Sequence, residues 1–275
     1  MPSPPDDATA ERMRRAHRKA ESALLVGVEG AAETWGRGGR SLSRPAAGDQ
    51  WLRVLAASGP SDNEDTAYWD GSEAAESAIP ASVPRPRLKS SYDWLEEDFA
   101  YRAELYERVH EHPLSGGALP PADLRLPDSW WTSLRTALSE VAATPTERVA
   151  IRQPRLDRAM PKYLGAELDT WAPEWSTAHA DIQWSHLTGP GLCILGWERW
   201  GLAPAGYDAA CLYISSLTVP RLAERVRRTF ADVLDSPAGR FSQLAAASEY
   251  LQGMERGNNL ELRGPLRRQV ALLLS

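Results

Sequence analysis

Lysine, cysteine and long apolar runs are scarce in this 275-residue chain, and each scarcity narrows what the protein can be. Only three of its 31 basic residues are lysines, Lys19, Lys89 and Lys162, so lysine-dependent chemistry has few candidates. Two cysteines, Cys193 and Cys211, cannot form a disulfide framework or, by themselves, a zinc finger. We therefore expect a reducing, cytoplasmic setting.

The chain also lacks the signals of membrane and nucleic-acid-binding proteins. No apolar run approaches the ~20 residues that span a bilayer, and the polar first twenty residues do not have the pattern of a signal peptide. The formal net charge is -6 and the sequence pI is about 5.5, which argues against a nucleic-acid footprint. The length is that of one large or two small globular domains.

Residue patterning divides the chain into three parts. A polar tail and basic helix are expected over 1–19, with the helical pattern itself running over 9–25. A small strand-rich and loop-rich part is expected over 20–93, and its proline-rich end at 80–86 interrupts regular structure. Helical spacing then dominates 94–275. The expected helices span 97–110, 128–142, 146–164, 220–234, 236–254 and 260–274.

Segment 177–213 carries the side chains best suited to chemistry. His179, Asp181 and His186 form an H-x-D-x4-H cluster, which is followed by a Gly-Pro-Gly turn and an apolar strand expected over 192–195. Two imidazoles and a carboxylate can ligate a transition metal. A metal site usually has more ligands at closer spacing, so a metal centre is the weaker interpretation.

The order of motifs in this segment resembles the signature of the aminoglycoside phosphotransferase family. That signature runs H-x-D-x4-N, a turn and an apolar strand, then a D-W-E motif and finally P-x-x-Y-D-x-A. The matching residues here are His179-Ala-Asp181 with His186, Ile194-Leu195-Gly196-Trp197-Glu198, and Pro204-Ala-Gly-Tyr207-Asp208-Ala-Ala. The resemblance implies an α+β fold of the bilobal, protein-kinase-like type, with a strand-rich N-lobe over 20–93 and a helical C-lobe over 94–275.

The resemblance also assigns residues of the small lobe to a nucleotide site. The glycine cluster 35–41 lies where a loop would cover the nucleotide, so we expect Gly36 and Gly38 to contact a cofactor. Arg53 occupies the strand position at which the family has a phosphate-pairing lysine, and arginine can carry the same charge. None of the three lysines has that context.

The resemblance further predicts a helix and a lobe crossing after this strand. Glu73 or Glu76 lies where the helix that carries the partner glutamate belongs. The proline-rich stretch 80–86, followed by Trp94, matches the crossing between the lobes.

Two residues of the motif have expected structural roles. His179 should hydrogen-bond the backbone of the next turn, and Asp208 should brace the catalytic loop. Cys193 and Cys211 lie in apolar surroundings, where a free cysteine packs as a small hydrophobic residue.

The resemblance breaks at both positions that would hold Mg²⁺. The family's catalytic-loop asparagine is replaced by His186 and its following-strand aspartate by Gly196, whereas the catalytic aspartate is kept as Asp181. Mg²⁺ prefers oxygen ligands in octahedral geometry, and each lost charge-stabilising group commonly raises the barrier by ~3–4 kcal/mol. We therefore predict no metal site, and a nucleotide cofactor would have to bind without Mg²⁺.

Three hypotheses about function remain open. The first is a pseudokinase that binds a peptide, a small molecule or a partner enzyme in antibiotic or natural-product metabolism. The second is an active ATP-dependent O-phosphotransferase of an antibiotic or a Ser/Thr-bearing peptide, and the third is a cleft repurposed for non-phosphoryl chemistry on a natural product. Asp181 and His186 are the expected catalytic groups. The expected partners are a small-molecule or peptide ligand in the interlobe cleft and a partner protein, with no nucleic acid and no membrane.

Overall fold

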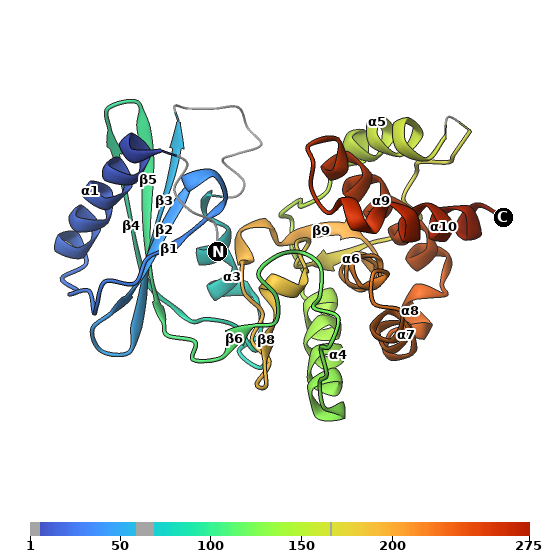
Figure 1. Ribbon diagram of the computed structural model, residues 1–275, viewed down its shortest axis with the longest axis horizontal. Coiled ribbons are helices and arrows are strands. Elements are labelled where there is room, and N and C mark those ends of the chain that lie inside the picture. Colours follow the sequence, from blue (N-terminus) through green and yellow to red (C-terminus); the bar gives the residue numbers. More distant parts are fainter. Residues whose placement is uncertain (1–5, 59–68, 166) are drawn as a thin grey trace. The chain divides into compact units, whose positions relative to one another are not determined.

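The computed structural model describes residues 6–58, 69–165 and 167–275, and the chain divides into two units (Figure 1). Unit 1 consists of Met1–Ser77 and Arg85–His110, and unit 2 consists of Ala78–Pro84 and Glu111–Ser275. Within the described residues, no helix combines the length and hydrophobicity needed to cross a bilayer.

Unit 1 is built on an antiparallel sheet with the strand order β1-β2-β3-β5-β4. Its elements are α1 (Asp7–Ala23), β1 (Thr34–Trp35), η1 (Arg37–Gly39), β2 (Ser41–Ala46), β3 (Gln50–Ser58), α3 (Gly71–Ala78), β4 (Leu88–Glu96) and β5 (Phe99–Glu107). Glycines therefore connect β1 to β2 where a nucleotide-covering loop was expected, and the predicted strand at Arg53 is confirmed as part of β3.

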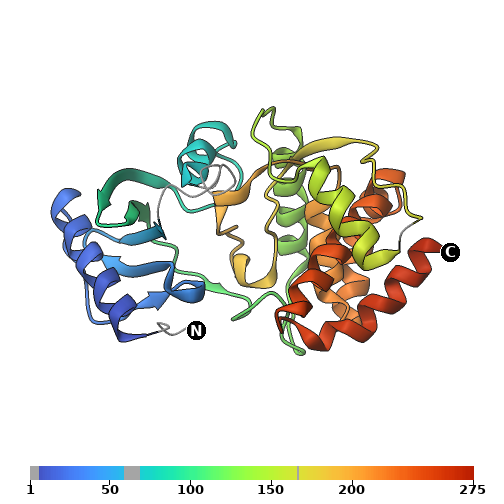
Figure 2. The ribbon, with the colours of Figure 1, turned by 90° about the horizontal axis from the view of Figure 1, so that it is seen from above.

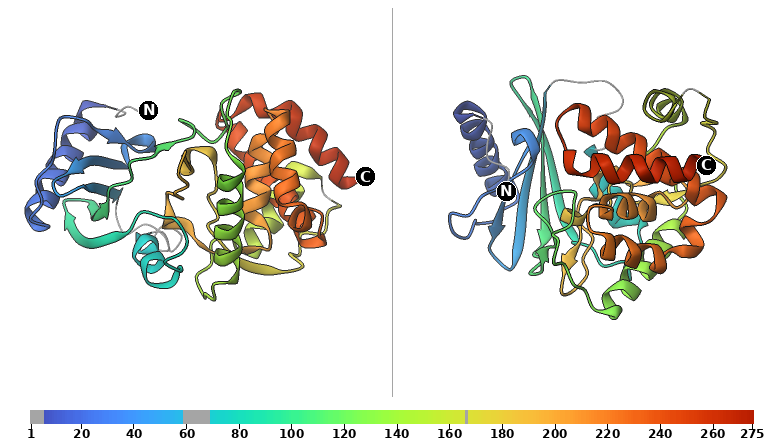
Figure 3. Two further views of the ribbon diagram at one scale, coloured as in Figure 1. Left: turned by 90° about the horizontal axis from the view of Figure 1, so that it is seen from below. Right: turned by 45° about the vertical axis from the view of Figure 1, so that its right-hand side comes forward.

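Helix α1 covers one face of this sheet (Figures 1 and 3). Its first turn is capped by Asp6, whose carboxylate accepts a hydrogen bond from the Thr9 backbone N–H at 2.7 Å. Met13, Ala16 and Ala20 recur at helical spacing and are buried in the core of the sheet. Because α1 shares this core, the predicted helix belongs to the strand-rich unit and is not a separate appendage.

The helix predicted over 97–110 is wrong, because these residues form β5. Tyr101, Ala103 and Leu105 alternate at the period of two that is typical of a strand, and all three are buried in the core shared with α1. β5 pairs with both β3 and β4 along its length. Unit 1 therefore extends to His110, beyond the expected boundary at residue 93.

The predicted lobe crossing at 80–86 and Trp94 is also wrong. Residues Ala78–Pro84 belong to unit 2, but the chain then returns to unit 1 and forms β4 and β5. Trp94 lies within β4, where it stacks on Tyr101 of β5 with ring centroids 5.1 Å apart. The final passage into unit 2 follows β5, after His110.

Unit 2 is mainly helical (Figure 2), and α6 is its most deeply buried helix. Every residue of α6 is buried, and the helix packs against α7 and α9. The elements of unit 2 are β6 (His112–Pro113), α4 (Asp128–Ala143), α5 (Gln153–Leu164), β7 (Trp175–Ala178), η2 (Trp184–His186), β8 (Thr188–Gly189), η3 (Trp197–Arg199), β9 (Gly201–Pro204), α6 (Tyr207–Ser216), α7 (Pro220–Thr229), α8 (Ala231–Leu234), α9 (Pro237–Glu255), η4 (Leu260–Leu262) and α10 (Arg263–Leu274).

Most helices predicted for this unit are present, with shifted ends. The helix expected over 146–164 begins only at Gln153, next to Pro154, because Val149 is extended and bridges Leu202 of β9. The helix expected over 220–234 is divided into α7 and α8 at Phe230. The apolar strand predicted over 192–195 is wrong in extent: it is reduced to one bridge between Leu187 and Ile194.

Candidate functional site

The loop between β7 and η3 carries the motif residues of unit 2, and Asp208 fixes its start. Asp208 lies in the first turn of α6, and its carboxylate accepts hydrogen bonds from the backbone N–H groups of His179 at 2.7 Å and Ala180 at 2.9 Å. Burial raises the Asp208 pKa to about 6, although the two N–H donors oppose the shift. The predicted bracing role of Asp208 is confirmed.

His179 is a structural residue, as its motif position predicted. The side chain is fully buried, and its Nδ1 accepts a hydrogen bond from the Asp181 backbone N–H at 3.3 Å. The proton is therefore on Nε2, which donates to the Leu195 carbonyl at 3.0 Å. Burial, together with the neighbouring His186, lowers the His179 pKa to about 3, so the ring is neutral and ties the two ends of the loop together.

Asp181 and His186, the two predicted catalytic residues, lie side by side in this loop. His186 Nδ1 donates to the Asp181 backbone carbonyl at 2.8 Å and lies 3.6 Å from the Asp181 carboxylate. This leaves His186 Nε2 as an acceptor, 3.3 Å from the Gln183 side-chain nitrogen. Both side chains are partly exposed, so they can contact a ligand. Sequence reasoning missed Gln183, which belongs to the motif segment but occupies none of its defining positions.

Gly196 lies directly beside the His186 ring. Its φ of 80° and ψ of 59° are left-handed, a conformation that favours glycine. A Cβ at this position would lie 3.2 Å from Cε1 and 3.3 Å from Nδ1 of His186. The imidazole therefore lies tightly against the position of a Cβ at residue 196 and would have to shift by a few tenths of an ångström to admit one.

The residues of this loop do not fit Mg²⁺. The partly exposed side chains at the loop's motif positions are the Asp181 carboxylate and the His186 imidazole, and an imidazole nitrogen is a poor ligand for a cation that prefers oxygen. Across the described part of the chain, no cluster of three or more His, Cys, Asp or Glu side chains could hold a metal ion. The chemistry available at the loop is hydrogen bonding and proton transfer by a carboxylate and an imidazole.

The three predicted cofactor-binding residues all lie in unit 1. Gly36 follows β1 and packs on Ser41, since a Cβ on Gly36 would lie 2.1 Å from the Ser41 hydroxyl oxygen. Gly38 has a φ of 64°, and a Cβ there would meet no atom within 4 Å. Arg53 on β3 faces Glu104 on β5 in register, with the guanidinium 3.7 Å from the carboxylate.

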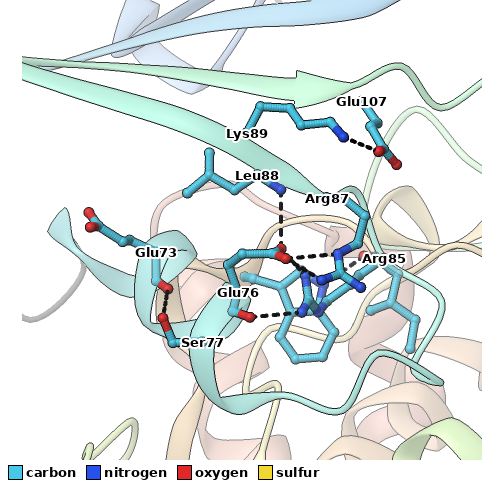
Figure 4. Close-up of polar contacts among 10 residues, drawn as sticks. Glu73, Glu76, Ser77, Arg85, Arg87, Leu88, Lys89 and Glu107 are labelled. Carbon is cyan, nitrogen blue, oxygen red and sulfur yellow. Dashed lines mark hydrogen bonds and ion pairs between the residues drawn. The ribbon is translucent and has the colours of Figure 1, made fainter.

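Figure 4 shows Glu76 of α3 facing Arg85 and Arg87, which lie in the segment just before β4. The Glu76 carboxylate contacts both Arg85 and Arg87 and accepts a hydrogen bond from the Leu88 backbone N–H at 3.1 Å. Burial alone would raise the Glu76 pKa, but hydrogen bonds from Arg87 and Arg85 lower it overall.

Glu73 of α3 pairs with Arg102 at 2.5 Å. The carboxylate beside Arg53 therefore belongs to Glu104, which is 1% exposed and also accepts a hydrogen bond from Tyr106. Sequence reasoning missed Glu104 because an acidic residue within a strand carries no motif.

Known proteins resemble this chain in their structures. No family model matches the chain, and no curated protein matches it. Among solved structures, it is similar to the apo form of a thermostable mutant of aminoglycoside phosphotransferase APH(4)-Ia, with 15% identity, a TM-score of 0.62 and coverage of 94% of this chain and 98% of that chain. Spectinomycin phosphotransferase APH(9)-Ia, solved with ADP and spectinomycin, shows 8% identity, a TM-score of 0.58 and coverage of 95% and 97%.

A third similar structure is the amicoumacin kinase hAmiN with AMP-PNP, Ca²⁺ and Ami, with 7% identity, a TM-score of 0.53 and coverage of 98% and 96%. Each match extends over nearly the whole of both chains, so the likeness concerns the complete architecture. At these identities the likeness establishes the fold. The chain therefore has the protein-kinase-like fold of the aminoglycoside phosphotransferases, as its motifs predicted.

Proposed function

We propose that this protein is a pseudokinase: a kinase-fold protein that binds a peptide or small organic ligand of antibiotic or natural-product metabolism without metal-dependent phosphoryl transfer. The observation that carries the proposal is the packing of the His186 ring on Gly196. In phosphoryl transfer the metal ions bridge the phosphates and neutralise developing charge. Here the first ligand position holds an imidazole, and the second holds a glycine against which that imidazole packs.

The ion pairs of unit 1 support the same proposal. Arg53, which stands in the position of the phosphate-pairing lysine, lies beside the buried Glu104 carboxylate. An active kinase keeps an ion pair between its strand lysine and a helix glutamate, whereas the carboxylate beside Arg53 comes from the neighbouring strand β5. Both α3 glutamates hold other arginines.

The second candidate function is an active O-phosphotransferase, and Asp181 favours it. Its side chain is 36% exposed, and its backbone is held by His179. A positioned and accessible carboxylate is what a general base in phosphoryl transfer requires. The similar structures include phosphotransferases that were solved with ADP or AMP-PNP.

Nucleotide titration separates the two functions. The thermal unfolding midpoint is measured with ATP alone, with Mg²⁺ alone and with both. ADP release is measured with two candidate acceptors: spectinomycin, and hygromycin B, with which a mutant of APH(4)-Ia has been solved. We expect no stabilisation that requires Mg²⁺ together with ATP, and no acceptor-dependent ADP release. A midpoint that rises only with MgATP, together with ADP release that Asp181→Asn abolishes, would establish the phosphotransferase instead.

A further inference from the structure

A cavity of about 270 Å³ opens on unit 2 beside the first turn of α4 and the start of α7. Its lining includes Arg125, Asp128, Trp131, Arg221, Leu222 and Arg225, which we call the basic pocket. A larger cavity of about 340 Å³ lies beside Asp208, but its arginine, Arg135, is already paired with Asp232 at 2.5 Å. Of these two cavities, the basic pocket is therefore the one with more arginine side chains available to a ligand.

The arginines of the basic pocket keep hydrogen-bond donors that have no acceptor among the described residues. Three arginines against one aspartate give its lining a formal charge of +2, in a chain whose net charge is -6. Arg225 donates to the Asp128 carboxylate at 2.6 Å, but its Nε is buried and has no hydrogen-bond partner among the described residues. Arg125 and Arg221 are exposed, and neither has a side-chain partner in the described part of unit 2.

The other wall of the basic pocket is apolar and leads to the catalytic loop. Trp131 and Leu222 line it and are both largely buried. The Arg225 guanidinium carbon lies 5.4 Å from the centre of the Trp131 ring. Trp131 also packs edge-on against Trp184 of η2, with ring centroids 6.3 Å apart, and η2 ends at His186. A ligand on Trp131 is therefore one aromatic side chain away from the loop that carries the motif.

We propose that the basic pocket binds an acidic peptide segment. In this arrangement a peptide carboxylate pairs with Arg125 and Arg221, and an adjacent apolar side chain packs on Trp131 and Leu222. The planar guanidinium fork binds carboxylates through two parallel hydrogen bonds, and arginine clusters recognise acidic motifs in this way. The inference rests on the proposed function, because it names the ligand class of a kinase-fold binding protein.

The size and exposure of the basic pocket favour a peptide over a free organic anion. Its volume lies below the ~300–1,000 Å³ of pockets that enclose a whole small molecule, so it can take one anionic group and one apolar side chain. Exposed ion pairs contribute little individually. Useful affinity therefore requires a ligand that continues over the neighbouring surface, as a peptide does.

The test is selection from a display library of random decapeptides on the full-length wild-type protein. Enriched peptides are synthesised with a fluorescein label, and their affinities are measured by fluorescence anisotropy. The variant is the double substitution Arg125→Ala with Arg221→Ala. The matched control is Arg228→Ala with Arg256→Ala, which removes the same charge from exposed positions outside the pocket.

We expect the enriched peptides to carry Asp or Glu next to an aliphatic or aromatic residue. Their affinity for the double variant should fall about ten-fold in total, which corresponds to ~1.4 kcal/mol for the two arginines together, while the control should change it less than about two-fold. Asp128→Asn should tighten binding, because it removes the carboxylate that competes for Arg225. Raising the ionic strength should weaken binding of the acidic peptides.

Several results would overturn the proposal: no enrichment, enrichment of neutral or basic peptides, or equal affinity for the pocket variant and the control. Displacement of the peptide by free succinate at a similar concentration would show a site for small organic anions instead. Failure here is distinguishable from failure of the proposed function. MgATP turnover would refute the pseudokinase and leave peptide binding intact, whereas loss of peptide binding leaves the argument from His186 and Gly196 unchanged.

Discussion

The contact between His186 and Gly196 predicts that these two positions are coupled energetically. Gly196→Asp places a Cβ 3.2 Å from the His186 ring, closer than the ~3.5–4.0 Å of optimal carbon contacts. Displacing a packed ring costs ~1–3 kcal/mol, and the left-handed backbone adds ~1 kcal/mol for a residue other than glycine. Gly196→Asp should therefore lower the free energy of unfolding by roughly 2–4 kcal/mol.

His186→Asn shortens the side chain and relieves the steric part of this cost. The amide can still donate to the Asp181 carbonyl, so the single substitution should cost less than ~1 kcal/mol. In the His186→Asn background, Gly196→Asp should cost only the backbone part, about 1 kcal/mol. The double-mutant cycle should thus give a coupling energy of ~1–3 kcal/mol, above the ~0.5 kcal/mol scatter of independent sites.

Equilibrium denaturation of the four proteins measures this coupling, and unit 2 offers a matched control. Gly257 has a φ of 81°, nearly that of Gly196, and a Cβ there would meet no atom within 4 Å. Gly257→Asp should therefore show the backbone cost alone and no dependence on residue 186. If Gly196→Asp costs the same with and without His186→Asn, the packing argument is refuted.

The same double variant tests whether the site is a kinase that lacks only its metal ligands. His186→Asn with Gly196→Asp restores an amide and a carboxylate at the two metal positions. We expect no efficient ATP turnover, because Arg53 would still pair with Glu104 of β5 and not with a glutamate of α3. Acceptor-dependent ADP release that appears only in the double variant would contradict this expectation.

Three further predictions concern stability. The Asp208 pKa is raised to about 6 from an ordinary ~3.9, so the folded protein binds this proton more tightly than the unfolded chain does. The free energy of unfolding of the wild type, relative to that of Asp208→Asn, should therefore fall as the pH rises from about 4 to about 6. Urea unfolding across this pH range measures the difference. The His179 pKa is lowered to about 3 from ~6.5, so the folded protein binds this proton less tightly than the unfolded chain does. The stability of the wild type relative to His179→Gln should therefore fall as the pH decreases from about 6.5 to about 3, as measured by thermal unfolding. Glu76→Gln should destabilise unit 1 by roughly 3 kcal/mol, because it removes the charge that faces the buried Arg85. Glu73→Gln, at a side chain that is 59% exposed, should cost under ~1 kcal/mol. Unfolding in guanidinium chloride measures both variants, and equal effects of the two substitutions would contradict this reasoning.

The sequence by itself determined the motif loop and, through it, the fold class. His179, Asp181 and Asp208 lie within thirty residues of one another, and the hydrogen bonds that hold the loop are made almost entirely inside that stretch. Interactions of this kind depend on residue type and spacing, which a sequence displays directly. The same spacing exposed the replacement of both metal-ligand positions, by His186 and Gly196.

The tertiary structure alone decided what these residues contact. Strand β5 was mistaken for a helix because Phe99, Ala103 and Tyr106 also fit a helical period, and only its pairing with β3 and β4 distinguishes the two. That pairing brings Glu104 opposite Arg53 across about fifty positions of sequence, a juxtaposition that no local pattern contains.

The basic pocket is the clearest example of a feature that the sequence does not show. Arg125 precedes α4, whereas Arg221 and Arg225 lie on α7, nearly a hundred residues later. In the sequence these arginines are three of 28, and their spacing does not set them apart from the others. Only helix packing brings them to one cavity beside Trp131, because side chains gather in space according to the faces their helices present and not according to their order in the chain.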